Sequence, residues 1–549
     1  MQCDIEHALL AAGARDIRFE SPRHFFTVNG DSHPWQLEVQ WDDLTVLPEF
    51  FLALDHCFRH RPHVSWNRKI CYSDGEGISF DLEMLEAVLA EALAEAVSVL
   101  EAEGDGELSS FWDESEGYFN LIGKNENRGW MDCYFPLDES PRKLNSSQRP
   151  LFPNTINFFE NKKQCWMPES SSGFSLSTKI KEKRNPSAFY LPLDHPVVPP
   201  LPGEDWTVEE IQPLVMPFVG KVANLEKHLK KHQQYYIFST PRSDGSRGAF
   251  GVCVIQNKNF GEKIRYYTVH RHARKYLLER GGLPEVQPTT QQRVAIIGCG
   301  AVGGYLASLL AQSGYTEFTL VDYDIFQAEN CYRHILPKQY IGVEKVLALK
   351  TFLEEGYIDL NIIPVTKVAI DWATPENIDN HSVIISATGN PTLERRLNQL
   401  FHQHSPAGHI FLSTWLEPVG IGGHVILSVS ESQGCLNCLF TSENEFSGVL
   451  MTSFIQPGQK VTRNLTGCGG AFTPFSGLDA QQTALLAVRT LEKYRCGQGG
   501  SIYDCWIGGR EVANSTQITT SAVYDSHFTD KKDWWQQKQR HGCPVCQRR

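Results

Sequence analysis

A glycine-rich turn constrains the fold of this chain more than any other feature. The segment VAIIGCGAVGG covers residues 294–304. Its glycines follow the order G-x-G-x-x-G at Gly298, Gly300 and Gly303, between an apolar run and a helical pattern. Glycine lets the backbone turn tightly and approach phosphate oxygens, and the following helix N-terminus offers free N–H groups. Apolar strand-like runs then alternate with helical patterns, which is typical of a parallel sheet. We therefore predict an α/β nucleotide-binding domain of the Rossmann type.

The composition fits a large soluble protein. The chain has 549 residues, of which 41% are hydrophobic and 21% charged, so two to four domains are expected. A net charge of -13 argues against a general nucleic-acid binder, which normally presents a basic face. The uncharged run 294–316 is long enough to span a bilayer, but its phosphate-turn spacing fits a strand, a turn and a helix. The acidic start does not resemble a secretory signal. We expect a cytoplasmic protein without a membrane span.

We predict three domains. Residues 1–120 contain strand-like stretches and then a helical pattern at 80–103, which predicts an α+β domain. Residues 121–285 form a middle or linker domain with two strands, a charged helix around 265–280 and no legible chemistry. The nucleotide-binding domain occupies residues 286–549.

Residues beyond the glycine turn favour ATP over a dinucleotide. Asp322 ends the next strand, where an acid would hold ribose hydroxyls, and Asp324 follows it. When ATP is cleaved between its α and β phosphates, negative charge builds on the leaving pyrophosphate. Arg333 and Lys345 can neutralise that charge, and Asn330 can donate a hydrogen bond. A plain NAD site with surface Asn, Arg and Lys side chains is the alternative.

Residues 270–549 resemble the adenylating superfamily of ubiquitin-activating enzymes, which includes the bacterial activators of sulfur carriers. The glycine turn and the D-x-D, N-x-x-R and G-x-x-K elements stand in the family's order. The resemblance implies ATP and Mg²⁺ as cofactors, with Asp322 on the ribose. It places Asn330, Arg333 and Lys345 on the phosphates, the last two as catalytic residues.

The chain departs from that family at one position. The family has an acid that holds magnesium where this sequence has Gly389. We therefore expect Asp324, or the ATP phosphates with water, to hold Mg²⁺. The family often uses an arginine from just before its first strand, sometimes one of the partner subunit. Arg274 and Arg280 are candidates, and surface residues of a helix are the alternative interpretation.

Two C-x-x-C pairs predict a metal site. They place four cysteines at Cys435, Cys438, Cys543 and Cys546. Four thiolates close a tetrahedron around Zn²⁺ and leave no open position, so we predict a structural zinc that ties the C-terminus to the adenylation domain. The sulfur-carrier activators resemble the chain here. Chance pairs or a redox dithiol are the alternatives. With 15 cysteines and no secretory signal, a disulfide framework is not expected.

A third cysteine lies in a glycine-rich segment before a helical pattern. Cys468 has flexible glycines around it and no close carboxylate, which suits a thiol that must reach an acyl-adenylate. This position resembles the crossover-loop cysteine of the activating enzymes. An inert cysteine in a turn is the alternative.

Cys71 is the second candidate nucleophile. The segment around it resembles the active-site segment of ubiquitin-conjugating enzymes, in which an H-P-N element precedes the cysteine. Here Val64 follows His63 and the asparagine of that element is missing. Asn67 or His63 would have to stabilise the oxyanion instead. Alone, Cys71 also fits an inert cysteine in a strand-to-turn step.

A conjugating-type domain ahead of an activating-type domain resembles the fused activating-and-conjugating enzymes of bacterial anti-phage systems. The resemblance implies that the C-terminus of a cGAS-like nucleotidyltransferase is adenylated, captured by Cys468, passed to Cys71 and joined to an amine of a lysine-bearing target. It also implies a homodimer. Three rivals stay open: an activator of sulfur carriers, an NAD-dependent oxidoreductase, and a scaffold without activity.

Overall fold

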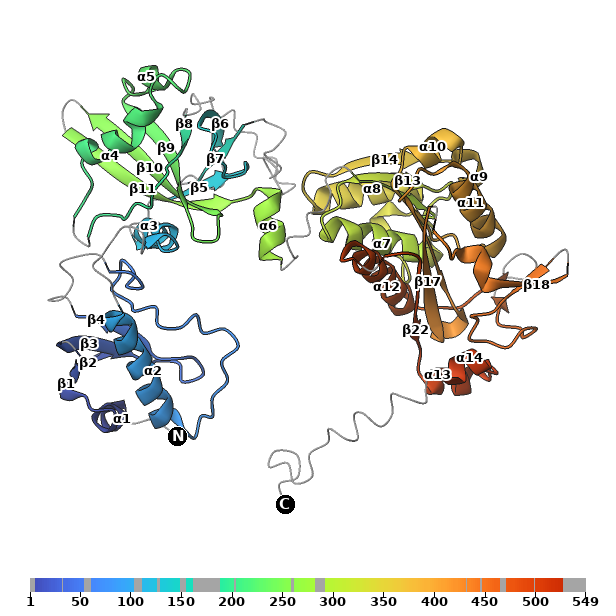
Figure 1. The fold of residues 1–549 in the computed structure, drawn as a ribbon, viewed down its shortest axis with the longest axis horizontal. Coiled ribbons are helices and arrows are strands. Elements are labelled where there is room, and N and C mark those ends of the chain that lie inside the picture. The colour runs from blue at the N-terminus through green and yellow to red at the C-terminus, as the bar shows by residue number, and fades with distance from the viewer. Residues whose placement is uncertain are drawn as a thin grey trace. The chain divides into compact units, whose positions relative to one another are not determined.

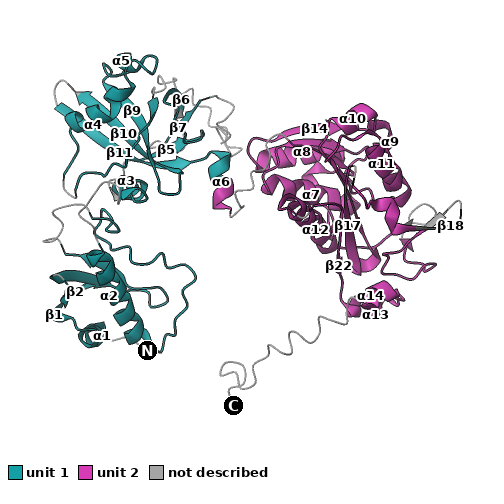
Figure 2. Ribbon diagram, viewed as in Figure 1, with its two compact units in different colours: residues 1–277 teal, residues 278–549 magenta. Residues whose placement is uncertain are grey.

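The computed structural model describes most of the chain. It covers residues 5–31, 33–53, 61–102, 111–125, 129–148, 155–160, 188–201, 204–257, 261–281, 292–430, 432–444, 447–464, 471–497 and 499–526. The chain divides into two compact units, residues 1–277 and 278–549 (Figure 2). The predicted domain boundaries at residues 120 and 285 stay predictions.

The first unit begins with a small antiparallel sheet packed against a long helix (Figure 1). Its elements are α1 (Ile5–Ala11), β1 (Arg15–Glu20), β2 (Arg23–Asn29), β3 (Pro34–Gln40), β4 (Glu49–Leu52) and α2 (Leu85–Glu101), and the strands pair in sequence order. Trp35, Leu37 and Val39 of β3 are buried, at every second position, as the core-facing side of a strand requires. They share one core with the buried apolar stripe of α2. This part of the molecule is therefore α+β.

The long helix is shorter than the sequence predicts. We expected it over residues 80–103, whereas α2 begins at Leu85. The Asp81 carboxylate accepts a hydrogen bond from the Glu83 amide, and the Asp81 carbonyl accepts one from Met84, each at 2.9 Å. This side-chain turn competes with the first helical turn and delays the helix.

The second part of the first unit is a closed barrel. Its strands are β5 (Trp130–Cys133), β6 (Arg142–Gln148), β7 (Thr155–Phe159), β8 (Ala188–Pro192), β9 (Gln233–Pro241), β10 (Arg247–Asn257) and β11 (Gly261–Arg271), closed in the order β10-β11-β5-β7-β6-β8-β9. Its helices are α3 (Ser115–Asn125), α4 (Val208–Val215) and α5 (Leu225–His228). A further helix, α6 (Arg274–Arg280), contains the boundary between the two units (Figure 2). Phe119 of α3 stacks on Phe250 of β10 with ring centroids 3.8 Å apart. Residues assigned by sequence to a middle domain thus have a fold that their sequence did not reveal.

The predicted charged helix at 265–280 is wrong in its first half. Residues up to Arg271 belong to β11, and only Arg274–Arg280 are helical. β11 pairs antiparallel with β10, where Tyr267 lies opposite Gly251, and parallel with β5. Pairing on both edges satisfies its backbone groups, so the sheet outweighs the local helical preference.

The second unit contains a seven-stranded sheet in the order β14-β13-β12-β15-β16-β17-β22. Its strands are β12 (Arg293–Ile297), β13 (Glu317–Val321), β14 (Asn361–Val365), β15 (Val383–Ser386), β16 (Ile410–Leu416), β17 (Gly422–Val429) and β22 (Ile502–Ile507). Two short ribbons lie outside this sheet. One pairs β18 (Phe440–Asn444) with β19 (Ser447–Leu450), and the other pairs β20 (Arg463–Asn464) with β21 (Ala471–Phe472). The helices are α7 (Ala301–Gln312), α8 (Lys345–Gly356), α9 (Ala369–Trp372), α10 (Pro375–Asp379), α11 (Pro391–His404), α12 (Gly477–Arg495), α13 (Arg510–Thr516) and α14 (Ala522–Ser526).

Helices cover both faces of this sheet. The strands from β14 to β16 are parallel, and β17 and β22 add antiparallel edges. Val294 and Ile296 face a core with α7, α8 and α12, whereas Ala295 and Ile297 face α9, α10 and α11 (Figure 1). This is the predicted α/β arrangement, in which both faces of a parallel sheet are buried. In the part of the chain that the structure describes, the helices are too short or too polar to cross a bilayer.

Candidate active site

The glycine turn connects β12 to α7 and is shaped by close backbone contacts. Gly298 has φ +88°, and a Cβ there would lie 2.8 Å from the Ala387 carbonyl oxygen. A Cβ at Gly303 would lie 1.9 Å from the Gly298 carbonyl oxygen. At Gly300, the residue before α7, an added Cβ would meet open space. Gly298 and Gly303 therefore allow the close packing of the turn, and Gly300 keeps the helix N-terminus accessible.

Asp322 joins the glycine turn to the D-x-D loop. Its carboxylate accepts hydrogen bonds from the Cys299 amide at 2.7 Å and from the Asp324 amide at 2.9 Å. Because β12 and β13 are parallel neighbours, their carboxyl ends meet at one edge of the sheet. The structure thus brings two predicted site segments together through Asp322. Its predicted role on ribose stays a prediction.

Lys345 is held in the same loop. The residue is buried, and its Nζ lies 2.8 Å from Oδ2 of Asp324, which is exposed. The Lys345 amide also donates to the Asp324 carbonyl at 2.9 Å. Two residues predicted for phosphate and magnesium therefore contact each other, and the cation is positioned beside the glycine turn before any nucleotide is bound.

Asn330 and Arg333 have other partners in this structure. The Asn330 side-chain oxygen accepts a hydrogen bond from the Gln327 amide at 2.9 Å, which closes a short turn. The Arg333 guanidinium lies over the Phe475 ring, 5.3 Å from its centroid. Phe475 precedes α12, whose first residue, Gly477, packs so closely that a Cβ there would lie 2.8 Å from the Tyr332 carbonyl oxygen. The predicted phosphate-binding segment therefore packs against the segment that follows Cys468.

The loop containing Gly389 is held by a carboxylate that sequence reasoning missed. One oxygen of Glu394 accepts hydrogen bonds from the amides of Thr388 and Gly389, at 3.2 and 3.1 Å, and the other accepts from Ser413 at 2.6 Å. Burial raises the pKa of Glu394 to about 7. Glu394 lies one helical turn before Leu397 on the buried side of α11, so a charge on that apolar stripe was the available signal.

The first C-x-x-C pair has the geometry of half a zinc site. The Sγ atoms of Cys435 and Cys438 lie 3.9 Å apart in a short 3₁₀ turn, with the Cys438 amide donating to the Cys435 carbonyl. A tetrahedral zinc with Zn–S bonds of about 2.3 Å requires an S–S separation of about 3.8 Å. This pair therefore fits zinc. Cys543 and Cys546 lie outside the described residues.

Cys71 is exposed, and a backbone hydrogen bond connects it to His63. The Cys71 amide donates to the His63 carbonyl at 2.7 Å, and His63 has the left-handed φ of 58° that is unusual for a residue other than glycine. His63 Nδ1 lies 3.2 Å from a carboxylate oxygen of Glu114. Although the residue is exposed at the surface, surrounding protein atoms partly desolvate its sulfur. This desolvation, and then the charge of Glu114, raise the pKa of the Cys71 thiol, and the charge of Lys69 lowers it. Glu114, distant in the sequence, was missed because no local pattern points to it.

The two predicted donors near Cys71 differ in their surroundings. His63 is bound to Glu114, whereas Asn67 is exposed and accepts a hydrogen bond from Ser65 at 2.5 Å. Cys468 lies outside the described residues. The segments on either side of it, β20 and β21, pair antiparallel, and α12 confirms the helix predicted after it.

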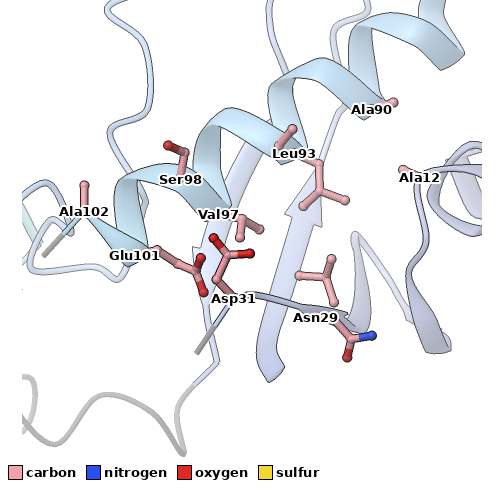
Figure 3. A pocket seen from close by; sticks show the side chains of 11 residues that line it. Ala12, Asn29, Asp31, Ala90, Leu93, Val97, Ser98, Glu101 and Ala102 are labelled. Carbon is pink, nitrogen blue, oxygen red and sulfur yellow. The ribbon is translucent and has the colours of Figure 1, made fainter. Parts of the chain in front are cut away.

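A separate cavity of about 480 Å³ lies beside α2 (Figure 3). Asn29, Asp31, Leu93, Val97 and Glu101 are among the residues that line it. None of the predicted nucleotide or thiol residues line this cavity, so it is not the predicted active site. Arg274 and Arg280 both lie on α6, and their predicted role stays untested.

The comparisons with known proteins decide the family of the second unit. Residues 272–516 match the ThiF family. They form a ThiF-type domain. The chain is 23% identical to the ATP-dependent ubiquitin transferase-like protein Cap2 of Escherichia coli strain TW11681 over 537 residues, which cover 86% of this chain and 87% of that protein. The match to Cap2 of Vibrio cholerae serotype O1 is 29% identical and covers 43% of this chain but only 41% of that protein.

Two further proteins are similar to part of the chain. Molybdopterin-synthase adenylyltransferase of Salmonella typhimurium is 26% identical over 129 residues, which cover 23% of this chain and 52% of that protein. A solved structure of E. coli MccB with ATP aligns over 45% of this chain and 70% of that one, at 16% identity and a TM-score of 0.31. The resemblance seen in the sequence is confirmed at this level: the chain is similar to Cap2 proteins and has a ThiF domain in its C-terminal part.

Proposed function

We propose that this chain uses ATP to activate the C-terminal carboxylate of a protein and then transfers the acyl group through two cysteines to an amine. The observation that supports it most is the ThiF-type domain, in which the glycine turn, Asp322 and the Lys345–Asp324 pair meet at one edge of the sheet. A dinucleotide site does not require a buried lysine there.

In the first step, a carboxylate oxygen of the substrate attacks the α-phosphorus of ATP. The bond from the α-phosphorus to the bridging oxygen breaks, and pyrophosphate leaves with the electron pair. Lys345 and Arg333 offset the charge that develops, Arg333 after leaving the Phe475 ring. Bound Mg²⁺ would add charge neutralisation at the phosphates, and Asp324 is the acid that would hold it, because Gly389 offers no carboxylate.

In the next steps, thiols carry the acyl group. The Cys468 sulfur attacks the acyl carbonyl and AMP leaves; the Cys71 sulfur then attacks the thioester and the Cys468 thiolate leaves. A substrate amine finally attacks the Cys71 thioester, giving an amide and the free thiol. Because the pKa of Cys71 is raised, its thiol needs a group that accepts the proton. We assign His63, held by Glu114, as the acceptor of this proton. The Asn67 amide is not a base, so it can serve only the other predicted role, donation to the oxyanion.

The proposed partners rest on the resemblance of the sequence to the fused enzymes of anti-phage systems, and an exposed surface of the second unit supports one of them. We infer a cGAS-like nucleotidyltransferase as the conjugated protein and a lysine-bearing protein as the target. Several large apolar side chains are exposed in the segment that contains Asp324 and Lys345. They are Tyr323, Ile325, Tyr332, Ile341, Val343 and Leu347. Of these, Tyr332 is 97% exposed. An apolar surface of this kind supports a homodimer. We also propose that the four cysteines of the two C-x-x-C pairs bind a structural zinc and that the protein is cytoplasmic.

ATP–pyrophosphate exchange tests the first step. With a cGAS-like nucleotidyltransferase as substrate, wild-type protein should exchange labelled pyrophosphate into ATP. Lys345→Ala should lose on the order of 10²-fold or more, because a buried cation is removed from the developing charge. Lys338→Ala, a change on the neighbouring 3₁₀ turn, is the control and should keep full exchange. Bound nicotinamide dinucleotide and no exchange would overturn the proposal.

Reducing and non-reducing gels test the relay. The wild type should form a reductant-sensitive adduct with the substrate, Cys71→Ala should retain an adduct at Cys468, and Cys468→Ala should form none. An unchanged product yield in Cys71→Ala would favour an activator of sulfur carriers, in which Cys71 has no role.

A further inference from the structure

Three side chains of metal-ligand type converge on adjacent strands of the barrel. Asp132 of β5 and His270 of β11 are partners in the parallel register, and His272 follows β11. Oδ1 of Asp132 lies 3.3 Å from His270 Nδ1 and 3.2 Å from His272 Nε2, and the three ligand atoms lie within 4.8 Å of one another. These residues belong to the first unit, so they are separate from the cysteine pair in the second.

The two imidazoles stack on aromatic residues of β5 and of the position directly after it. Trp130 and Tyr134 flank Asp132 at alternate positions, and they stack on His270 and His272 with centroid distances of 6.0 and 4.8 Å. The His272 amide donates to the Cys133 carbonyl at 2.7 Å, which fixes the backbone of that residue. The orientation of both rings is therefore set by packing before any ligand binds.

The two distances from the Asp132 carboxylate oxygen match those between ligand atoms around a small divalent metal. With bonds of about 2.0–2.1 Å, a tetrahedral zinc requires neighbouring N and O ligand atoms about 3.3 Å apart. Oδ1 of Asp132 has about this separation from each of the two imidazole nitrogens. The Asp132 residue is 3% exposed, and a carboxylate so deeply buried is costly without a compensating charge. A dication on the three ligand atoms would supply that charge.

We propose that Asp132, His270 and His272 form a binding site for a divalent transition metal, with zinc as the expected ion. Two imidazole nitrogens and one carboxylate oxygen are ligands that zinc accepts, and three protein ligands leave a fourth position open. Because the His270 side chain is half-exposed, water or an anionic oxygen can reach the site from solvent.

Metal content of the full chain tests the proposal. The test is made in the Cys435→Ser/Cys438→Ser background, so that zinc on thiolates does not contribute. After chelation and reloading with Zn²⁺, elemental analysis should find one zinc per chain. His270→Ala in that background should bind zinc at least tenfold more weakly. His195→Ala should keep the zinc, because this control histidine forms an exposed pair with Asp194 outside the triad.

A second measurement tests the proposal even if the Cys435→Ser/Cys438→Ser protein does not fold. This measurement uses Co²⁺ and the chain with both cysteines intact. Co²⁺ bound to thiolates gives sulfur charge-transfer absorption, whereas Co²⁺ bound to nitrogen and oxygen ligands gives visible bands without charge-transfer absorption. His270→Ala should remove the latter bands only. A folded background variant that takes up no zinc, or cobalt spectra identical with and without His270, would overturn the proposal. Neither readout uses adenylation, so failure of the proposed function is a separate result.

Discussion

At the scale of single residues, Glu394 shows how a buried carboxylate shapes the candidate nucleotide site. It binds the amides of the loop in which the family has its magnesium acid, and its pKa is raised to about 7. Since the folded pKa exceeds the ordinary value of 4.5, the folded protein binds a proton that the unfolded chain has lost between these values. Stability should therefore fall as pH rises from about 4.5 to 7.

Glu394→Gln should remove this dependence. A shift of that size corresponds to about 3 kcal/mol, so wild-type stability at pH 7.5 should be lower than at pH 4.5 by an amount of that order, and the variant should show a smaller loss. Urea unfolding at both pH values, followed by a signal of the ThiF-type domain, measures it. If the free energy of unfolding changes equally with pH in the wild type and in Glu394→Gln, the raised pKa does not belong to Glu394.

His63 and Asn67 give a matched pair for the chemistry at Cys71. His63→Ala should slow transfer from Cys468 to Cys71 by about 10²-fold, because the proton acceptor is removed, whereas Asn67→Ala should change it less than twofold. Single-turnover gels follow the step. Since the pKa of Cys71 is raised, its thiolate fraction grows as pH increases, and high pH should partly rescue His63→Ala. A structural role for His63 predicts no such rescue.

At the scale of elements, different glycines of the turn between β12 and α7 serve folding and the proposed nucleotide binding. A methyl group at Gly303 would overlap the Gly298 carbonyl, while one at Gly300 meets open space. Gly303→Ala should therefore destabilise the protein by about 1–3 kcal/mol. Gly300→Ala should preserve the melting temperature but weaken ATP binding, because the methyl group occupies the approach to the helix N-terminus. Calorimetry measures both; similar behaviour of the two variants would refute this division.

At the scale of the whole molecule, the apolar surface beside the nucleotide site predicts association of two chains. Tyr332→Asp places a charge at its most exposed residue and should shift sedimentation from dimer to monomer. Met451→Asp changes an exposed apolar residue on another part of the same unit and should leave the dimer intact. A wild-type protein that sediments as a monomer would remove the basis for the inferred homodimer.

Much of the candidate site was predictable because its signals are local. The glycine spacing predicted the turn between β12 and α7, and the helix after Cys468 followed from its apolar period. Glu114 and Glu394 were missed because each acts on residues brought close by folding. The strand β11 was taken partly for a helix, since its pairing with β10 and β5 is invisible to local propensity.

The sequence by itself determined the α/β class of the second unit, its glycine turn and the chemical types of the candidate ligands and nucleophiles. These depend on backbone preferences and side-chain chemistry within a few residues. Only the tertiary structure decided that Asp322 binds the glycine turn, that Lys345 is paired with Asp324, and that Asp132 meets two histidines. Each contact depends on strand register or helix packing between distant segments, which the burial of a shared core sets.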